Sequence, residues 1–296
     1  MRRRFVTLDV FTLKRFSGNP LAVVFEPDGL DTDAMQAIAR EFNYPETVFV
    51  LPAQDQAHRA KLRIFTPAAE LPFAGHPTIG TAVALARGGD KQQTFALSET
   101  IGPVACEVTL RGADSGQASF ALPQLPLESG TAPDASAIAA ALGLQAGDIG
   151  GDFRPACWAT GLGFVYVPVK SLAAVAKARP DPVQFEQTFA MGAPGKAYLF
   201  CRETSDANSD FHARMFAPGM GIPEDPATGS AAASLGGLLA SQASLKDGTH
   251  RFRIEQGYEM GRPSQIDLTI EIANGKLTGG SIGGGAVIVC EGHIDA

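Results

Sequence analysis

Two segments that lie half a chain apart share the same order of residue types. Arg63–Pro67 corresponds to Arg214–Pro218, and His76–Ala82 corresponds to Asp225–Ala231. Each copy predicts a strand, then a loop that contains proline, and then a helix rich in glycine and alanine. A chain that repeats this unit is expected to fold as two similar domains.

The length and the composition also favour two folded domains. The 296 residues are 45% hydrophobic and 19% charged, which is enough apolar material for two cores. The formal net charge is -7, and the longest cluster of basic residues is Arg2–Arg4. A nucleic acid or an anionic membrane is therefore not expected as a partner.

The N-terminal segment lacks the features of a secretory signal, because Asp9 interrupts its apolar stretch after only a few residues. The long apolar run of a membrane-spanning helix is missing from the sequence. The cysteines stand singly and form no Cys-x-x-Cys pair, as expected for free, buried thiols in a reducing compartment (Cys106, Cys157, Cys201 and Cys290). We expect a cytoplasmic protein that needs neither a metal nor an organic cofactor.

The composition changes at Pro123–Pro133, where proline, serine and glycine become frequent and a linker is predicted. The domain boundary is placed near residue 124. Strands are predicted over most of both halves. The predicted helices cover residues 31–42 and 77–87 in the first half, and residues 135–142, 171–178, 182–191 and 226–242 in the second.

His76 and Asp225 are the polar residues that precede a proline in the two copies of the repeat. Proline is favoured at the first helical position, so both residues are predicted to be N-caps. Aspartate is a common N-cap, and a structural role alone explains Asp225. Histidine is not a preferred cap, so His76 suggests a function, although a buried, hydrogen-bonded histidine is the alternative.

The starts of the two repeated helices are candidate anion sites. The first turn of a helix has unpaired N–H groups and the positive end of the dipole. Gly75, Gly80 and Gly229 would let a ligand or another backbone approach closely. If the two halves face each other, both helix starts line one cleft, where a substrate carboxylate would bind.

Glu46 is a candidate general base. It follows the Tyr44-Pro45 break and precedes the apolar strand predicted at residues 47–51. A carboxylate at the mouth of such a strand is partly desolvated, which strengthens it as a base. An exposed glutamate in a turn is the alternative, and spacing alone does not decide between them.

Four segments together resemble the phenazine-biosynthesis protein PhzF family. They follow the order of the family over most of the chain, and the third and fourth are the most specific. The segments are Asp9–Thr12 with Gly18–Val23, Pro45–Val50, Arg63–Pro67 through Glu70–Thr78, and Gly221–Ala231.

The resemblance implies an α+β fold similar to that of diaminopimelate epimerase. Two pseudo-symmetric domains are expected, each with a curved, mainly antiparallel sheet around a central helix, and with the active site between them. The N-terminal domain would span residues 1–124 and be completed by a C-terminal strand near 286–296, and the C-terminal domain would span residues 125–285. The resemblance also implies a homodimer.

The resemblance further implies roles for individual residues. A family glutamate that matches Glu46 lifts and returns the proton, and residues that match His76 and Asp225 orient or assist. The residues that match the substrate-binding positions, or adjoin them, are Gly75, Gly229 and Ser230.

The sequence departs from other relatives of this fold in one respect. Enzymes of this fold that racemise proline or epimerise diaminopimelate use a pair of cysteines at the two helix starts. Gly75–Thr78 and Asp225–Gly229 contain no cysteine. A two-thiol racemase is therefore disfavoured, and an oxygen base with a neighbouring histidine is expected.

These features predict a cofactor-independent isomerase or epimerase that moves a proton within a small carboxylated metabolite. Glu46 would abstract the proton, and the helix dipoles would stabilise the resulting anion. Glu46, or His76 with Asp225, would return the proton to another carbon or to the opposite face. The substrate, the choice between a double-bond shift and an inversion, and a link to phenazine synthesis stay open.

The main alternative is a non-catalytic protein that binds a small acid in the same cleft. A nucleotide-dependent oxidoreductase is less consistent, because Gly161–Gly163 and Gly283–Gly285 do not complete a dinucleotide-binding pattern and are interpreted as turns. A serine hydrolase is less consistent still, because no Gly-x-Ser-x-Gly nucleophile elbow is expected. The other histidines lack partners at metal-ligand spacing and are expected at the surface (His58, His212, His250 and His293).

Overall fold

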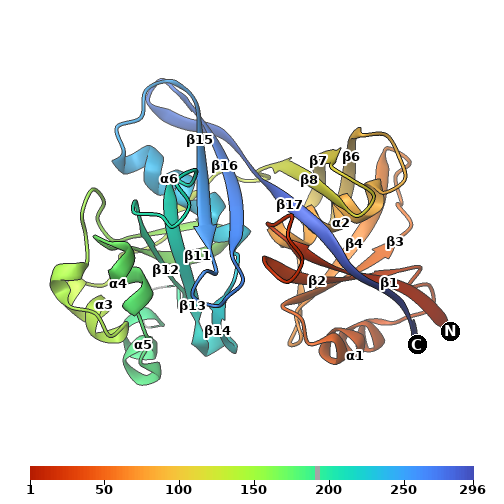
Figure 1. Cartoon of the computed structure of the whole chain (residues 1–296), viewed down its shortest axis with the longest axis horizontal. Helices are drawn as coiled ribbons and strands as arrows, with labels where there is room; N and C mark the ends of the chain where they lie inside the picture. The colour runs from red at the N-terminus through yellow and green to blue at the C-terminus, as the bar shows by residue number, and fades with distance from the viewer. Residues whose placement is uncertain (191–193) are drawn as a thin grey trace. The chain divides into compact units, whose positions relative to one another are not determined.

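The computed structural model describes residues 1–190 and 194–296 and divides into two compact units. Unit 1 comprises Met1–Pro123 and Gly283–Ala296, and unit 2 comprises Gln124–Ile282. Figure 1 shows that strands dominate both units and helices are few, so the fold is a sheet-rich mixed α/β fold. The predicted helix 182–191 ends at Met191, which lies outside the described residues.

Unit 1 contains a sheet with mixed strand directions. Strand β1 pairs antiparallel with β2, β2 runs parallel to β3, β3 pairs antiparallel with β4, and β4 runs parallel to β6. Strands β6, β7 and β8 continue antiparallel, and the short β5 pairs with the end of β4. These strands are β1 (Arg2–Val10), β2 (Asn19–Phe25), β3 (Glu46–Leu51), β4 (His58–Phe65), β5 (Glu70–Leu71), β6 (Gln92–Glu99), β7 (Gly102–Leu110) and β8 (Ser115–Ala121).

The long strand β17 (Lys276–Asp295) belongs to both units, because its residues from Gly283 onward are part of unit 1. There it pairs antiparallel with the whole of β1. The interpretation of Gly283–Gly285 as a turn was wrong, since these residues lie inside β17. Gly279–Gly283 does have the Gly-x-Ser-x-Gly pattern that the sequence interpretation missed, but it lies inside this strand and forms no strand-to-helix elbow.

Helix α1 (Thr32–Phe42) forms where its predicted cap and apolar periodicity place it. The side chain of Asp31 accepts a hydrogen bond of 2.8 Å from the backbone N–H of Ala34, and Asn43 ends the helix in a left-handed conformation. One face of the helix is buried against β3 and β4, through Met35, Ile38 and Ala39 on the helix and Phe49 and Phe65 on the strands.

Helix α2 (Gly75–Ala86) is buried along nearly its whole length and contacts β1, β2, β3, β6, β7 and β8. Its small side chains allow these strands to approach closely. A Cβ atom on Gly80 would lie 2.5 Å from the side chain of Leu21 and 2.7 Å from that of Val10. A helix that is apolar on all sides is expected in such surroundings.

Unit 2 repeats the succession of strand pairings seen in unit 1. Antiparallel β10–β11, parallel β11–β12, antiparallel β12–β13, parallel β13–β15 and antiparallel β15–β16 follow one another, and β14 pairs with the end of β13 as β5 pairs with β4. This shared order accounts for the repeat in the sequence. The strands are β9 (Leu127–Glu128), β10 (Ala156–Thr160), β11 (Leu162–Pro168), β12 (Ala197–Cys201), β13 (Phe211–Ala217), β14 (Ile222–Asp225), β15 (Gly248–Gln256) and β16 (Ser264–Ala273).

The helices of unit 2 differ in their burial. Helix α6 (Gly229–Gln242) is the counterpart of α2 and is buried over most of its length against β10, β11 and β16. The other helices pack on the core formed by β10, β11, β12 and β13. They are α3 (Ala135–Ala141), α4 (Leu172–Lys177) and α5 (Pro182–Phe189), with short 3₁₀ turns at Ala146–Asp148 and Pro218–Met220.

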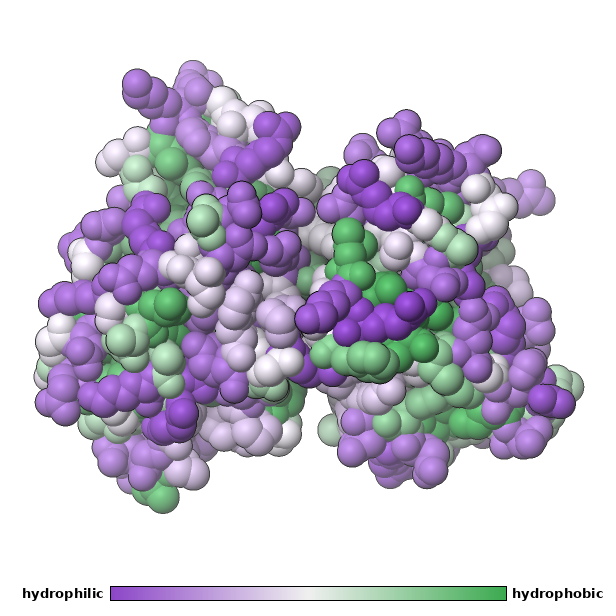
Figure 2. Space-filling view, in the orientation of Figure 1, coloured by the Kyte–Doolittle hydropathy of each residue, from purple (hydrophilic) through white to green (hydrophobic). Residues whose placement is uncertain are grey.

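The surface of each unit is largely hydrophilic on the face shown in Figure 2, where apolar residues appear in small groups among polar ones. Among the described residues, no helix is both long enough and apolar enough to cross a membrane. Cys106, Cys157 and Cys201 are buried free thiols, whereas Cys290 is exposed. The expectation of free, buried thiols is confirmed for Cys106, Cys157 and Cys201 and was wrong about burial for Cys290.

Candidate active site

Glu46 and His76 meet inside unit 1. Glu46 is the first residue of β3, and His76 is the second residue of α2. Glu46 Oε2 lies 3.1 Å from His76 Nε2, and the side chains are only 15% and 7% exposed. Successive residues of a strand point to opposite faces, so Glu46 faces α2 while Phe49 packs against α1.

Burial lowers the pKa of His76 to about 3, while a hydrogen bond with the backbone of Pro20 acts in the opposite direction. His76 is therefore neutral at pH 7. Proline has no backbone N–H, so the Pro20 carbonyl accepts and the imidazole donates. Because Nε2 faces Glu46, Nδ1 is the donor to Pro20, and Nε2 has a free lone pair. A lone pair and a carboxylate oxygen attract each other only through a proton, so the 3.1 Å approach would become a hydrogen bond once either side chain gains a proton.

The prediction that His76 is an N-cap was wrong. Helix α2 begins two residues before Pro77, and Ala74, in an extended conformation, is the N-cap without a side-chain hydrogen bond. The first backbone bond of the helix runs from the Thr78 N–H to the Ala74 carbonyl at 3.2 Å. Pro77 is thus the third helical residue, where its missing N–H also costs no helical bond. His76 lies in the first turn, beside the N–H groups expected to bind an anion.

A second carboxyl group, Glu99 at the end of β6, lies near the start of α2. The hydroxyl of Thr78 lies 2.7 Å from Glu99 Oε1 and 2.8 Å from the Ala74 carbonyl. A hydroxyl has one proton, so both contacts are satisfied when Glu99 is protonated and donates to Thr78, which donates to Ala74. Burial raises the pKa of Glu99 to about 8, although a hydrogen bond donated by Thr78 to the charged form would lower it, and the net rise agrees with a neutral carboxyl.

Our sequence interpretation missed Glu99, although a signal for it exists. In β6 the side chains of Leu97 and Glu99 are both buried, while the residues before them, Ala96 and Ser98, are less so. The alternation of a half-buried strand therefore assigns Glu99 to the inner face. A charged residue at an inner position of a strand is a candidate for a shifted pKa.

Asp225 lies at the end of β14 in unit 2. The hydroxyl of Thr228 donates to Asp225 Oδ2 at 2.5 Å, and Gln256 Nε2 donates to the Asp225 carbonyl at 2.8 Å. Gln256 also contacts Thr228, accepting from its N–H and donating to its hydroxyl. The prediction that Asp225 is an N-cap was wrong, because α6 begins at Gly229 and its N-cap is Thr228. Pairing of β14 with β13 holds Asp225 in the strand instead.

The helix starts show which residues of the repeat correspond. Gly75 and His76 are the first two residues of α2, and Gly229 and Ser230 are the first two of α6. The structure therefore matches His76 with Ser230, whereas the sequence repeat had matched His76 with Asp225. Gly229 is buried and Ser230 is partly exposed, so the Ser230 side chain is accessible at this helix start.

Glu46 has a cation as its counterpart in unit 2. The repeat makes Phe65 of β4 equivalent to Phe216 of β13. Thr47 pairs with Phe65 and Ala197 pairs with Phe216, so the residues that precede Thr47 and Ala197 are also equivalent. The residue before Ala197 is Lys196, whose pKa is lowered by burial and whose ammonium donates to the Pro194 carbonyl at 3.1 Å. The described residues thus place a carboxylate–imidazole pair in unit 1 and a partly buried lysine at the equivalent position of unit 2.

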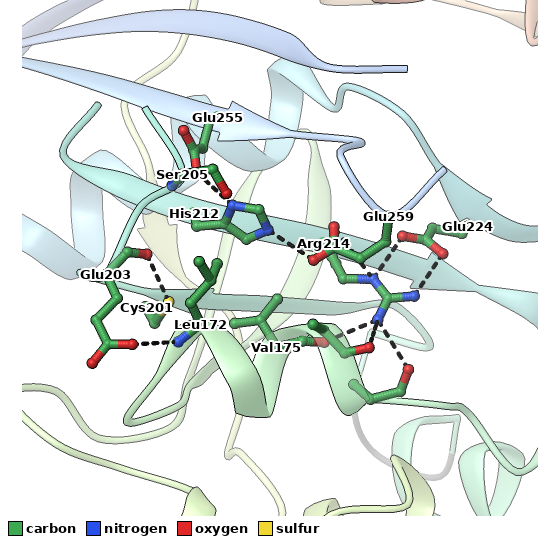
Figure 3. Close-up of polar contacts among 12 residues, drawn as sticks. Leu172, Val175, Cys201, Glu203, Ser205, His212, Arg214, Glu224, Glu255 and Glu259 are labelled. Carbon is green, nitrogen blue, oxygen red and sulfur yellow. Dashed lines mark hydrogen bonds and ion pairs between the residues drawn. The ribbon is translucent and has the colours of Figure 1, made fainter. Parts of the chain in front are cut away.

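His212 is not a surface residue, and the prediction that placed it there was wrong. It is 1% exposed on β13, with Nδ1 2.6 Å from Glu255 Oε1 and Nε2 3.0 Å from Glu259 Oε1 (Figure 3). Both ring nitrogens therefore face carboxylates, which raise the pKa of His212 against the effect of burial. Strand pairing brings His212 beside Glu255, a contact between residues far apart in the sequence.

The predicted site residues fall into two groups. Unit 1 holds Glu46 and His76 in contact, with Gly75 adjacent in the chain; unit 2 holds Asp225, Gly229 and Ser230 on one strand end and the helix start after it. Within residues 1–190 and 194–296, no three His, Cys, Asp or Glu side chains are grouped so that they could hold a metal ion. Acid–base chemistry is what the unit 1 pair provides.

Comparison with known proteins identifies the family. Residues 8–292 match the model of the PhzC-PhzF family, described as phenazine biosynthesis-like protein. This chain belongs to that family, which confirms the resemblance found in the sequence.

Individual relatives agree over nearly the whole chain. An uncharacterized isomerase of Mesorhizobium japonicum, mll1393, is 47% identical over 302 residues, covering 99% of this chain and 98% of the relative. Trans-2,3-dihydro-3-hydroxyanthranilate isomerase of Pseudomonas aeruginosa is 35% identical over 290 residues, covering 98% of each chain. The crystal structure of a PhzF-family phenazine biosynthesis protein of Bacillus anthracis matches with a TM-score of 0.90 and 27% identity over 100% of both chains. The protein is an enzyme of the isomerase and epimerase type.

Proposed function

We propose that the enzyme works without a cofactor and moves a proton within a small carboxylated metabolite by general acid–base catalysis. The observation that carries this proposal is the buried contact of 3.1 Å between Glu46 and a neutral His76. A carboxylate and an imidazole that share one proton can accept a proton from one atom and return it to another.

In this mechanism Glu46 takes the proton from the substrate, and the negative charge that develops is stabilised by the dipoles of the helix starts. The proton is then returned to another carbon or to the opposite face, by Glu46 itself or by His76 with Asp225. The substrate carboxylate is bound by backbone N–H groups and a hydroxyl at helix starts, from Gly75, Gly229 and Ser230. A well-placed acid or base contributes about 10²- to 10⁴-fold to such a reaction.

The wider proposal covers the fold and the assembly. We infer two pseudo-symmetric domains similar to those of diaminopimelate epimerase, and the shared order of strand pairings supports this. We also propose a cytoplasmic homodimer that acts on a small molecule. Sedimentation equilibrium of the purified protein tests the oligomeric state.

The substrate class is proposed from the relatives. Because a relative that is 35% identical isomerises trans-2,3-dihydro-3-hydroxyanthranilate, the first candidate is a cyclic diene that carries a carboxylate and an ionisable carbon–hydrogen bond. Neighbouring unsaturation delocalises the anion, so one carboxylate base is sufficient to remove the proton. Either a double-bond shift or an inversion of configuration follows from the same first step.

The test is incubation in heavy water. The enzyme is mixed with trans-2,3-dihydro-3-hydroxyanthranilate and with a panel of cyclic dienes, amino acids and hydroxy acids, and mass spectrometry identifies the compound that gains deuterium. Nuclear magnetic resonance then locates the deuterium: a different carbon indicates a double-bond shift, and the original carbon indicates inversion. Binding of a compound without any exchange would favour a non-catalytic binding protein instead.

Glu46→Gln is the decisive variant, because it keeps the size of the side chain and removes the base. We expect a loss of at least about 100-fold in exchange with little change in ligand binding. Glu41→Gln, at an exposed position of α1, is the matched control and should keep full activity. Full activity of Glu46→Gln removes Glu46 from the mechanism.

A further inference from the structure

Arg214 on β13 forms a two-pronged ion pair with Glu224 on β14. Its Nε and one terminal nitrogen each donate at 2.8 Å to the two carboxylate oxygens of Glu224 (Figure 3). The Arg214 side chain is 4% exposed and that of Glu224 is 16% exposed. A paired geometry of this kind fixes direction as well as distance, which a lysine could not do.

The remaining terminal nitrogen of Arg214 is bound to the end of α4. It donates to the carbonyls of Val175 at 2.9 Å and Ala178 at 3.0 Å. These carbonyls lie at the C-terminal end of the helix, which carries partial negative charge. Val175 also accepts from the backbone N–H of Ala178, and the Ala178 carbonyl also accepts from Arg179. Arg214 therefore joins β14 to α4 through bonds that use both sides of its guanidinium.

Strand geometry connects this ion pair to Asp225. Asp225 pairs directly with Met215, and Met215 pairs with Tyr198, so these three side chains share one face of the sheet. Arg214 and Glu224 are the neighbours of Met215 and Asp225 and lie on the opposite face. Anchoring Glu224 on one face thus fixes the backbone that presents the Asp225 carboxylate on the other.

Unit 1 contains an equivalent arginine–glutamate ion pair. Arg63 on β4 donates to both oxygens of Glu70 on β5, at 2.7 and 2.6 Å. Arg63 also donates to the hydroxyl of Thr32 on α1 at 2.9 Å, so this ion pair too lies on the sheet face away from the central helix. In each unit an arginine of the repeated strand anchors the short strand that leads to the helix start.

A chain of charges extends the unit 2 ion pair across the sheet. Figure 3 shows His212 between Glu255 and Glu259, and Arg214 between Glu259 and Glu224. Glu259 Oε2 lies 4.0 Å from Arg214 Nε. Glu255 also accepts from the backbone N–H groups of Ser205 and Asp206, so its charge is well supported. This row of charged side chains holds the guanidinium of Arg214 in place.

We propose that Arg214 is a positioning residue for Asp225, acting through Glu224. This inference rests on the proposed function of Asp225 in proton transfer. Without the two-pronged bond, β14 loses its anchor, and the Asp225 carboxylate leaves the orientation that the reaction needs. Substrate binding depends on the helix start at Gly229 and Ser230, which Arg214 does not contact, so it should change little.

The test uses Arg214→Lys, which keeps the charge and loses the paired geometry. Arg253→Lys, which perturbs a half-exposed pair with Asp267, is the matched control. Hydrogen exchange followed by mass spectrometry should show at least tenfold faster exchange in the peptide 222–230 of Arg214→Lys, with no change in the peptide 70–80. Unchanged exchange in 222–230 overturns the proposal, whether or not a substrate is known.

Kinetics separate positioning from a merely structural role. On the substrate found by deuterium incorporation, Arg214→Lys should lower kcat about tenfold per folded enzyme and leave KM within twofold, and the control should match the wild type. Adding Asp225→Asn should leave no further effect of Arg214→Lys, because Arg214 acts through Asp225. Additive losses in the double variant, or a lower folded fraction with normal kcat, overturn the inference. If the wild type exchanges no substrate proton, only the proposed function is disproved, because the hydrogen-exchange test of Arg214 does not depend on a substrate.

Should Arg214→Lys fail to fold, Glu224→Gln tests the same bond from the other side. It keeps one acceptor oxygen and the size of the side chain, and it should produce the same local increase in exchange and the same drop in kcat. A folded Glu224→Gln with normal exchange in 222–230 and normal kcat overturns the proposal.

Discussion

Glu46 Oε2 approaches His76 Nε2 to 3.1 Å, although one residue begins a strand and the other lies in the first turn of a buried helix. The packing of α2 against β3 makes the contact. Burial also lowers the pKa of the imidazole to about 3, so His76 is neutral over the whole neutral range.

The first prediction concerns the stability of the fold at low pH. The pKa of His76 is about 3 when folded and close to 6.5 when unfolded, so between these values the unfolded chain binds more protons. The contribution of His76 is therefore lost as the pH falls from 6.5 towards 3, by up to about 1.4 kcal/mol per pH unit. Urea unfolding of His76→Gln should show a flatter pH dependence in this window, and the exposed control His293→Gln should not.

The second prediction has the opposite sign. The pKa of Glu99 is raised to about 8, from 4.5 in an unfolded chain, so between pH 4.5 and 8 the folded protein binds more protons. The free energy of unfolding should therefore decrease as the pH rises through this window. Glu99→Gln keeps a donor towards Thr78 and should remove the decrease. Glu107→Gln, exposed on β7, is the control. A wild-type slope that persists in Glu99→Gln contradicts the assignment.

The third prediction concerns Gly257, which has a φ of 79°. A Cβ atom there would lie 2.5 Å from the backbone oxygens of both Arg262 and Pro226, the residue after Asp225. Gly257→Ala should cost roughly 2–5 kcal/mol from left-handed strain and overpacking, and should lower kcat. Gly275→Ala has a similar φ of 69° but open space, so it should cost only about 1–2 kcal/mol. Equal losses in the two variants would mean that the contact with Pro226 is unimportant.

The fourth prediction compares the two arginine–glutamate pairs. Arg214 is 4% exposed, and its loss leaves the largely buried Glu224 carboxylate without its paired donor, so Arg214→Gln should cost about 3–5 kcal/mol. Arg63 and Glu70 are 22% and 33% exposed, and Arg63→Gln should cost about 1 kcal/mol or less. Thermal unfolding of both variants measures the difference. A larger loss for Arg63→Gln would contradict the argument from burial.

The repeat in the sequence was sufficient to predict two equivalent pairs, each of a strand and the glycine- and alanine-rich helix that follows it. Arg63 and Arg214 do lie on corresponding strands, and α2 and α6 follow them. The helix starts were placed wrongly, because the preference for proline at the first position was applied to Pro77 and Pro226. In the structure α2 starts before Pro77, and α6 starts after Pro226, since β14 pairs with β13 and keeps Asp225 extended.

Contacts between distant segments explain the other errors. His212 was expected at the surface because no partner lies near it in the sequence, yet β13 runs parallel to β15 and places it beside Glu255. The pair of Glu46 and His76 likewise depends on the packing of a helix against a strand, which local patterns do not encode. Local sequence patterns therefore do not show which side chains lie next to one another in space.

Strand β17 gives the chain an order of assembly. Residues Ala286–Asp295 pair with β1, and they are translated after every residue of unit 2. During synthesis on the ribosome, β1 therefore lacks its partner β17 until all of unit 2 has been synthesised. The half of the protein that begins synthesis first is thus the last to be completed, and its unpaired edge needs protection from aggregation in the meantime.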